Sequence, residues 1–284
     1  MLSRYPGGVR TFLSAVLTLV AMAAIVLAVP SLWVKERLVD SEGFASSMRP
    51  VAEQQKVRDY MTEQITRGVI DRAGGAGSFT GGVTSAFVTP LARAYTDSDQ
   101  FEEDFVQVVA DQHDYLFDEP GADAADDQGL QLDIAPMVNR VLNKLGISAQ
   151  TDGIMVELSG SNLEAGRYHK TGRDITRLAL ASTAAAIIGA LGGLLIARRR
   201  GVVLLFLGLA TVAAAVVSYA VSVVGADRAK DELTGGAGSD REVSEAIVDT
   251  VLKNLHEVAF IVGGAGLGVA LLGAAIAVAM RRRG

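Results

Sequence analysis

His113 has the clearest potential for chemistry in this 284-residue chain, because it lies between Asp111 and Asp114. An imidazole beside carboxylates can exchange protons or bind a metal. A metal site needs three or four converging ligands, whereas His169 and His256, the other histidines, border apolar runs. We therefore predict that His113 is a helix-surface or packing histidine, and that the chain has no metal ligands.

Residues 118–129 form an acidic segment whose carboxylates are of a kind that binds calcium outside the cell. Their spacing differs from that of an EF-hand loop. We predict a solvated loop, and whether it binds Ca²⁺ stays open. The carboxylates are Asp118, Glu119, Asp123, Asp126 and Asp127.

Common catalytic motifs are missing from the sequence, which has no Gly-x-Ser-x-Gly, no His-Glu-x-x-His and no cysteine. The glycine-rich residues 263–268 lack the Lys-Ser/Thr of a phosphate loop and lie inside an apolar run. We expect no catalytic and no cofactor-binding residues. An enzyme site assembled only in three dimensions remains an alternative.

Four apolar runs without any charged residue or histidine organise the chain, and each is long enough to cross a bilayer. They cover residues 11–34, 178–197, 202–224 and 258–280. The first run is too long for a cleaved signal peptide and is predicted to be a signal-anchor. The fold class expected is a mostly α membrane protein: four transmembrane helices and a largely helical extracytoplasmic domain with a small two-stranded β element.

Charge is distributed unevenly between the segments that join these runs. Segments 35–177 and 225–257 hold 18 basic and 32 acidic residues, a net charge of −14. Segments 1–10, 198–201 and 281–284 hold only basic residues, and basic residues collect on the cytoplasmic side. We therefore expect both termini in the cytoplasm, the acidic segments outside the plasma membrane, and an orientation set by Arg4, Arg10, Arg198, Arg199, Arg200, Arg281, Arg282 and Arg283.

The outer segments show helical periodicity and two short strands. Pro50 is expected in the first turn of helix 51–72, and Asp99 with Glu102 resembles a capping box. Gly146 should end a helix that lies between the strands. The helix that starts near residue 239 should continue into the fourth run. The remaining expected elements are helices 41–48, 83–95, 97–116, 136–145 and 162–177, and strands 130–134 and 154–158.

Small residues within the spans predict close helix packing. Gly189 with Gly193, and Gly264 with Gly268, have the GxxxG spacing that lets helix backbones approach, either within the protein or between copies of it. Trp33 stands at the depth of an interfacial anchor. The spans lack ionisable residues, which argues against a proton-coupled transporter or a charged channel filter.

The layout resembles a family of actinobacterial four-span integral membrane proteins without an assigned activity. The resemblance rests on residues 33–40 with Phe44, on residues 50–52 and 98–101, on Phe105 and His113, on residues 132–136 with Val138, and on the arginines that flank the last spans. That family often has Trp at the position of Phe105. The resemblance implies location and architecture, and no catalytic residues.

Placement and charge together favour a cell-envelope scaffold, accessory subunit or sensor that acts through its acidic outer domain. The alternatives are a transporter or channel for an apolar or lipid-like substrate, and a membrane-tethered envelope enzyme. The expected partners are the lipid bilayer, other envelope proteins or a second copy of the chain. Nucleic acid is excluded because the basic segments are too short.

Overall fold

The structure is a computed structural model that describes residues 6–75, 85–119, 131–147, 153–157, 165–232 and 239–282. The described chain is mostly helical, and four of its helices are long and apolar enough to cross a membrane. This confirms the prediction of a mostly α membrane protein. The chain divides into a membrane unit (residues 1–36, 171–225 and 252–284) and a polar unit (residues 37–170 and 226–251).

The membrane unit contains the four predicted spans, each within one long helix. These are α1 (Pro6–Val34), α7 (His169–Ile196), α8 (Arg200–Glu232) and α9 (Ser239–Arg282). A short π-helix, η1 (Lys35–Val39), follows α1. Helix α9 runs without a break from the predicted outer helix through the fourth apolar run, which confirms that expectation.

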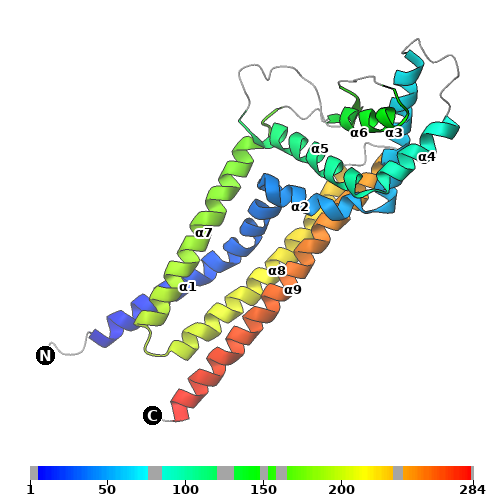
Figure 1. Cartoon of the computed structure of the whole chain (residues 1–284). Helices are drawn as coiled ribbons and strands as arrows, with labels where there is room; N and C mark the ends of the chain where they lie inside the picture. The colour runs from blue at the N-terminus through cyan, green and yellow to red at the C-terminus, as the bar shows by residue number, and fades with distance from the viewer. Residues whose placement is uncertain are drawn as a thin grey trace. The chain divides into compact units, whose positions relative to one another are not determined.

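The four spans contact one another through small and apolar side chains. Ala21 of α1 packs with Val203 and Leu207 of α8, and Ser14 Oγ donates a hydrogen bond to Gly193 O of α7, 3.1 Å away. Within this unit, the start of α1, the end of α9 and the α7–α8 turn lie at the same end of the helices (Figure 1).

In the polar unit, the boundary between the first two helices lies later in the sequence than predicted. Asp40 caps α2 (Ser41–Ala52), since its carboxylate accepts from the backbone N–H of Gly43 at 3.2 Å. Pro50 lies in the last turn of α2, and α3 (Gln55–Gly75) starts five residues later. The prediction that Pro50 opens the second helix is wrong, because a proline near a helix end removes only one intrahelical hydrogen bond.

Helices α4 (Ser85–Thr96) and α5 (Asp99–Phe117) follow. Pro90 lies within α4 without dividing it. The predicted capping box does not form, because Ser98 occupies the N-cap position and Asp99 is already helical. Ser98 Oγ donates to Tyr95 O instead, at 2.6 Å.

The predicted β element is present as an antiparallel pair, β1 (Gln131–Asp133) and β2 (Met155–Glu157). Helix α6 (Ala135–Lys144) lies between them in sequence, and Gly146 follows it with a φ of 73°. Asp133 Oδ1 accepts from the N–H groups of Ala135 (2.9 Å) and Ile154 (3.1 Å). One carboxylate therefore fixes both the start of α6 and the approach to β2.

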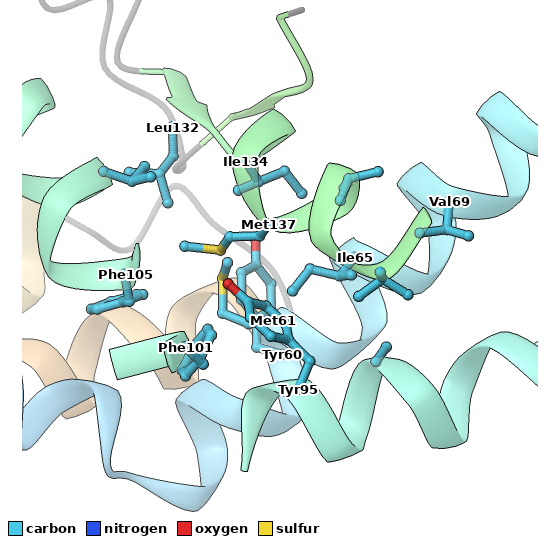
Figure 2. Packing of buried hydrophobic residues seen from close by; sticks show 14 of the residues in the cluster. Tyr60, Met61, Ile65, Val69, Tyr95, Phe101, Phe105, Leu132, Ile134 and Met137 are labelled. Carbon is cyan, nitrogen blue, oxygen red and sulfur yellow. The ribbon is translucent and has the colours of Figure 1, made fainter. Parts of the chain in front are cut away.

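A single apolar cluster fills the interior of the polar unit (Figure 2). It gathers side chains from α3, α4, α5 and α6 and from the strand region, among them Met61, Ile65, Tyr95, Phe101 and Met137. These helices are amphipathic, and each contributes its apolar face.

Candidate functional site

His113, the strongest chemical candidate in the sequence, lies inside an aromatic stack of the polar unit. Its ring is 4.4 Å from that of Phe44 and 4.4 Å from that of Phe117, with interplanar angles of 25° and 13°. Phe117 in turn stacks on Tyr168 at 5.6 Å. The side chain of His113 is buried, so of the two predicted roles it has that of a packing histidine.

The hydrogen bonds of the His113 ring fix its orientation. Nε2 lies 3.0 Å from Leu38 O, and a carbonyl can only accept, so Nε2 carries the proton. Nδ1 is 3.4 Å from the carboxylate of Asp114. Among the described residues no group of three or more acidic or histidine side chains is arranged to hold a metal ion. The stack thus links α2, α5 and the chain before α7.

A second polar cluster joins α4, α5 and α6 around Asp104. The Tyr95 hydroxyl donates to Asp104 Oδ2 at 2.6 Å, and Arg140 donates from Nη2 to Oδ1 at 2.7 Å and forms an ion pair through Nε. Burial, and then Asp104, raise the pKa of Tyr95. The hydrogen bond to Asp104 raises the pKa of Arg140. The cluster is charge-compensated and joins three helices at the edge of the apolar core.

We expect the polar unit to lose stability in strong alkali through Tyr95. An unfolded tyrosine ionises near pH 10, whereas the pKa of Tyr95 is higher in the folded unit. Above about pH 10 the unfolded state therefore binds fewer protons than the folded state. The contribution of Tyr95 to the free energy of unfolding is complete below about pH 10 and falls above it, by at most about 1.4 kcal/mol per pH unit. Urea unfolding of the full chain between pH 8 and pH 11 measures it.

The matched variants for this test are Tyr95→Phe and Tyr115→Phe, of which only the first alters a buried tyrosine. Tyr95→Phe should flatten the alkaline fall in the free energy of unfolding, and Tyr115→Phe should leave it in place. An equal alkaline fall in the wild type and in Tyr95→Phe would contradict the assignment.

Gly189 and Gly193, predicted to pack helices, lie against α1. A Cβ on Gly189 would lie 3.0 Å from both Ala21 Cβ and Leu17 O, and one on Gly193 would lie 3.0 Å from Thr18 Oγ1. The two glycines therefore give α7 its close approach to α1.

The second predicted pair, Gly264 and Gly268, faces open space, because a Cβ on either would meet nothing within 4 Å. Helix α9 approaches α8 through other glycines. A Cβ on Gly273 would lie 2.3 Å from Leu205 N, and one on Gly266 would lie 2.9 Å from Val212 N. Within the chain, α9 therefore packs on α8 through a face other than that of Gly264 and Gly268, and packing of this pair between copies of the chain stays a prediction.

The opposing face of α8 carries glycines too. A Cβ on Gly208 would lie 2.3 Å from Ala270 N, and one on Gly201 would lie 2.6 Å from Ala277 N. The sequence held a signal for this interface, since Gly201 and Gly208, like Gly266 and Gly273, are seven residues apart. Seven residues are about two helical turns, so each pair lies on one face.

Trp33, predicted to anchor at the membrane interface, is only 7% exposed. Its indole N–H donates to Asn254 Oδ1 of α9 at 3.2 Å. The side chain packs between helices instead of facing outward, because a buried indole N–H needs a hydrogen-bond acceptor and Asn254 supplies one.

Six of the predicted topology residues lie near the start of α1, the end of α7, the start of α8 and the end of α9. They are Arg10, Arg198, Arg199, Arg200, Arg281 and Arg282. Arg4 and Arg283 lie outside the described residues, as does most of the acidic segment 118–129. The side of the membrane that these arginines face stays a prediction.

Comparison with known proteins adds no assignment: no protein-family model, no curated protein and no solved structure matches the chain. The resemblance to an actinobacterial family therefore stays a prediction.

Proposed function

We propose that this chain is a multi-pass protein of the plasma membrane whose polar unit acts outside the cell as a scaffold, an accessory subunit or a sensor. The observation that supports this most directly is a polar unit with a filled core of its own, placed by the chain between membrane spans. The two chain segments that contain it, residues 35–177 and 225–257, carry a net charge of −14. Such a unit offers a stable acidic surface to partners.

The polar clusters support a role in binding and assembly better than one in catalysis. The nitrogen of His113 that carries the proton already donates to a backbone carbonyl, and Asp104 is neutralised by Arg140 and accepts from Tyr95. Both clusters join helices of the polar unit, so they hold its surface in one shape. A surface of fixed shape reduces the entropy lost on binding a partner.

The proposed orientation can be tested with single cysteines, because the chain has no cysteine of its own. Phe87 is 71% exposed in the polar unit, and Arg282 ends α9. We expect Phe87→Cys to react with a membrane-impermeant maleimide in intact cells, and Arg282→Cys to react only after permeabilisation. The reverse pattern would overturn the orientation.

The proposed role in binding can be tested with a photoreactive amino acid at the same exposed position. We expect the reagent at Phe87 to give a discrete adduct with one envelope protein or a second copy, mapped to a defined residue. Leu195 of α7, 72% exposed on a span, is the control and should capture lipid. No protein adduct from Phe87 or from the exposed polar-unit residue Tyr115 would contradict the proposal.

A further inference from the structure

A groove of about 650 Å³ lies in the membrane unit between α1, the α7–α8 turn and α8. Arg198 and Arg199 of the α7–α8 turn line it, and so do the polar residues Ser14 and Thr18 of α1. The rest is apolar and includes Leu19. We call this feature the arginine groove.

Within the described part of the membrane unit, no carboxylate lies near the two arginines of the groove. In the membrane unit the acidic residues are Glu36, Asp174 and Glu257. Asp174 precedes Arg198 by 24 residues, which is about 36 Å along a helix. Glu257 is 20 residues, about 30 Å, from Ala277, the residue of α9 that Gly201 faces. Glu36 lies 14 residues, about 21 Å, beyond Met22, the last groove residue of α1. Among the described residues of this unit, no carboxylate therefore reaches these arginines.

The start of α8 adds to the positive potential. The helix begins at Arg200, immediately after the two groove arginines, and Val202 of its first turn also lines the groove. The helix dipole places positive charge at this end of α8. The two arginines and the start of α8 thus favour an anion with several acceptor oxygens, such as a phosphate group.

The groove as a whole is long enough to hold part of a lipid chain. It extends along α1 from Thr11 to Met22, about 16 Å at 1.5 Å per residue, and Phe206 of α8 also lines it. This is about half of the roughly 30 Å hydrocarbon thickness of a bilayer. Ser14 and Thr18 use their hydroxyl protons within the protein, on Gly193 O and Ser14 O, so the arginines remain the donors for an incoming anion.

We propose that the arginine groove binds an anionic glycerophospholipid. The phosphate lies at Arg198 and Arg199, and one acyl chain runs along Leu19 and Met22 beside Phe206. A free phosphate would use only the arginine end, and a neutral lipid would use only the apolar part. An anionic lipid is the ligand that fits both, and basic pockets between membrane helices bind lipid head groups of this kind.

The test is native mass spectrometry of the full chain in detergent, titrated with phosphatidylglycerol or phosphatidylcholine of the same acyl chains. We expect phosphatidylglycerol to be retained about tenfold more tightly, and the double variant Arg198→Gln/Arg199→Gln to remove that preference. The matched control Arg281→Gln/Arg282→Gln loses the same charge outside the groove and should keep the preference.

Two further arms identify what the groove recognises. Ala15 lines the groove and is exposed, so Ala15→Trp should fill it and weaken phosphatidylglycerol binding without altering charge. Glycerol phosphate at millimolar concentration should fail to compete. Equal binding of the two lipids, an equal loss in the control variant, full binding by Ala15→Trp, or displacement by glycerol phosphate would each overturn the proposal.

Discussion

Replacing Gly208 with leucine should separate α8 from α9 and destabilise the membrane unit by at least about 3 kcal/mol. Added volume in a packed interface costs about 1–3 kcal/mol when side chains can yield. Here the first added atom would lie 2.3 Å from Ala270 N and 2.7 Å from Gly266 O. These are backbone atoms of α9, so relief requires the whole helix to move.

Two measurements check this result in the purified full chain. The first is thermal unfolding in detergent, in which Gly208→Leu should melt well below the wild type. The second is a disulfide between Ala215→Cys and Gly263→Cys, since a Cβ on Gly263 lies 3.3 Å from Ala215 Cβ, just below the range of about 3.5–4.5 Å that is usual for disulfides. The disulfide should form in the wild-type background and fail with Gly208→Leu.

Gly268→Leu is the control, because a Cβ there meets nothing within 4 Å. It makes the same chemical change in the neighbouring span, and a leucine in place of glycine favours a helix by up to about 1 kcal/mol. It should therefore melt no lower than the wild type. If Gly268→Leu and Gly208→Leu were equally destabilised, the α8–α9 interface described here would be incorrect.

Phe101→Ala should lower the free energy of unfolding of the polar unit by about 3–5 kcal/mol, the range for truncating a buried aromatic residue. Phe101 is 0% exposed and packs edge-on against Tyr95, with ring centroids 5.8 Å apart. Phe105 lies on its other side at 5.7 Å. The cavity left by alanine would open within the cluster in Figure 2, beside Phe105.

Hydrogen exchange of the full chain in detergent measures this effect locally. A loss of 3–5 kcal/mol corresponds to at least about a 100-fold loss of protection, and it should appear in α3 and α6 as well as in α5, because the cluster is shared. Phe87→Ala is the control, since Phe87 is 71% exposed and surface changes cost about 0.5 kcal/mol or less. Loss confined to α5 would contradict a common core.

The spans could be predicted from the sequence because their cause is local. Each run of apolar residues favours the bilayer by its own composition, whatever it contacts. The same holds for the strands, whose alternating pattern is visible within five residues. Gly146 could also be predicted to end α6, because a positive φ is a property of that residue alone.

The contacts between elements could not be predicted in this way. Gly264 and Gly266 are two residues apart on α9 and point to different faces, and only the position of α8 decides which one is buried. Asp104 and Arg140 are separated by 36 residues, so no local pattern connects them. Trp33 has the composition and depth of an interfacial residue, but Asn254, more than 200 residues later, determines where its N–H points.

The division of the polar unit into two chain segments has a consequence for its synthesis. The first segment ends at Lys170, and the second, residues 226–251, follows two membrane spans later. Gln54 of the first segment donates a hydrogen bond to Thr250 of the second. A ribosome adds about 5–20 residues per second, so the first segment is made some 3–11 s before the second begins. Assembly of the polar unit is thereby completed only after the second and third spans have been made, which makes membrane insertion a step in the folding of the polar unit.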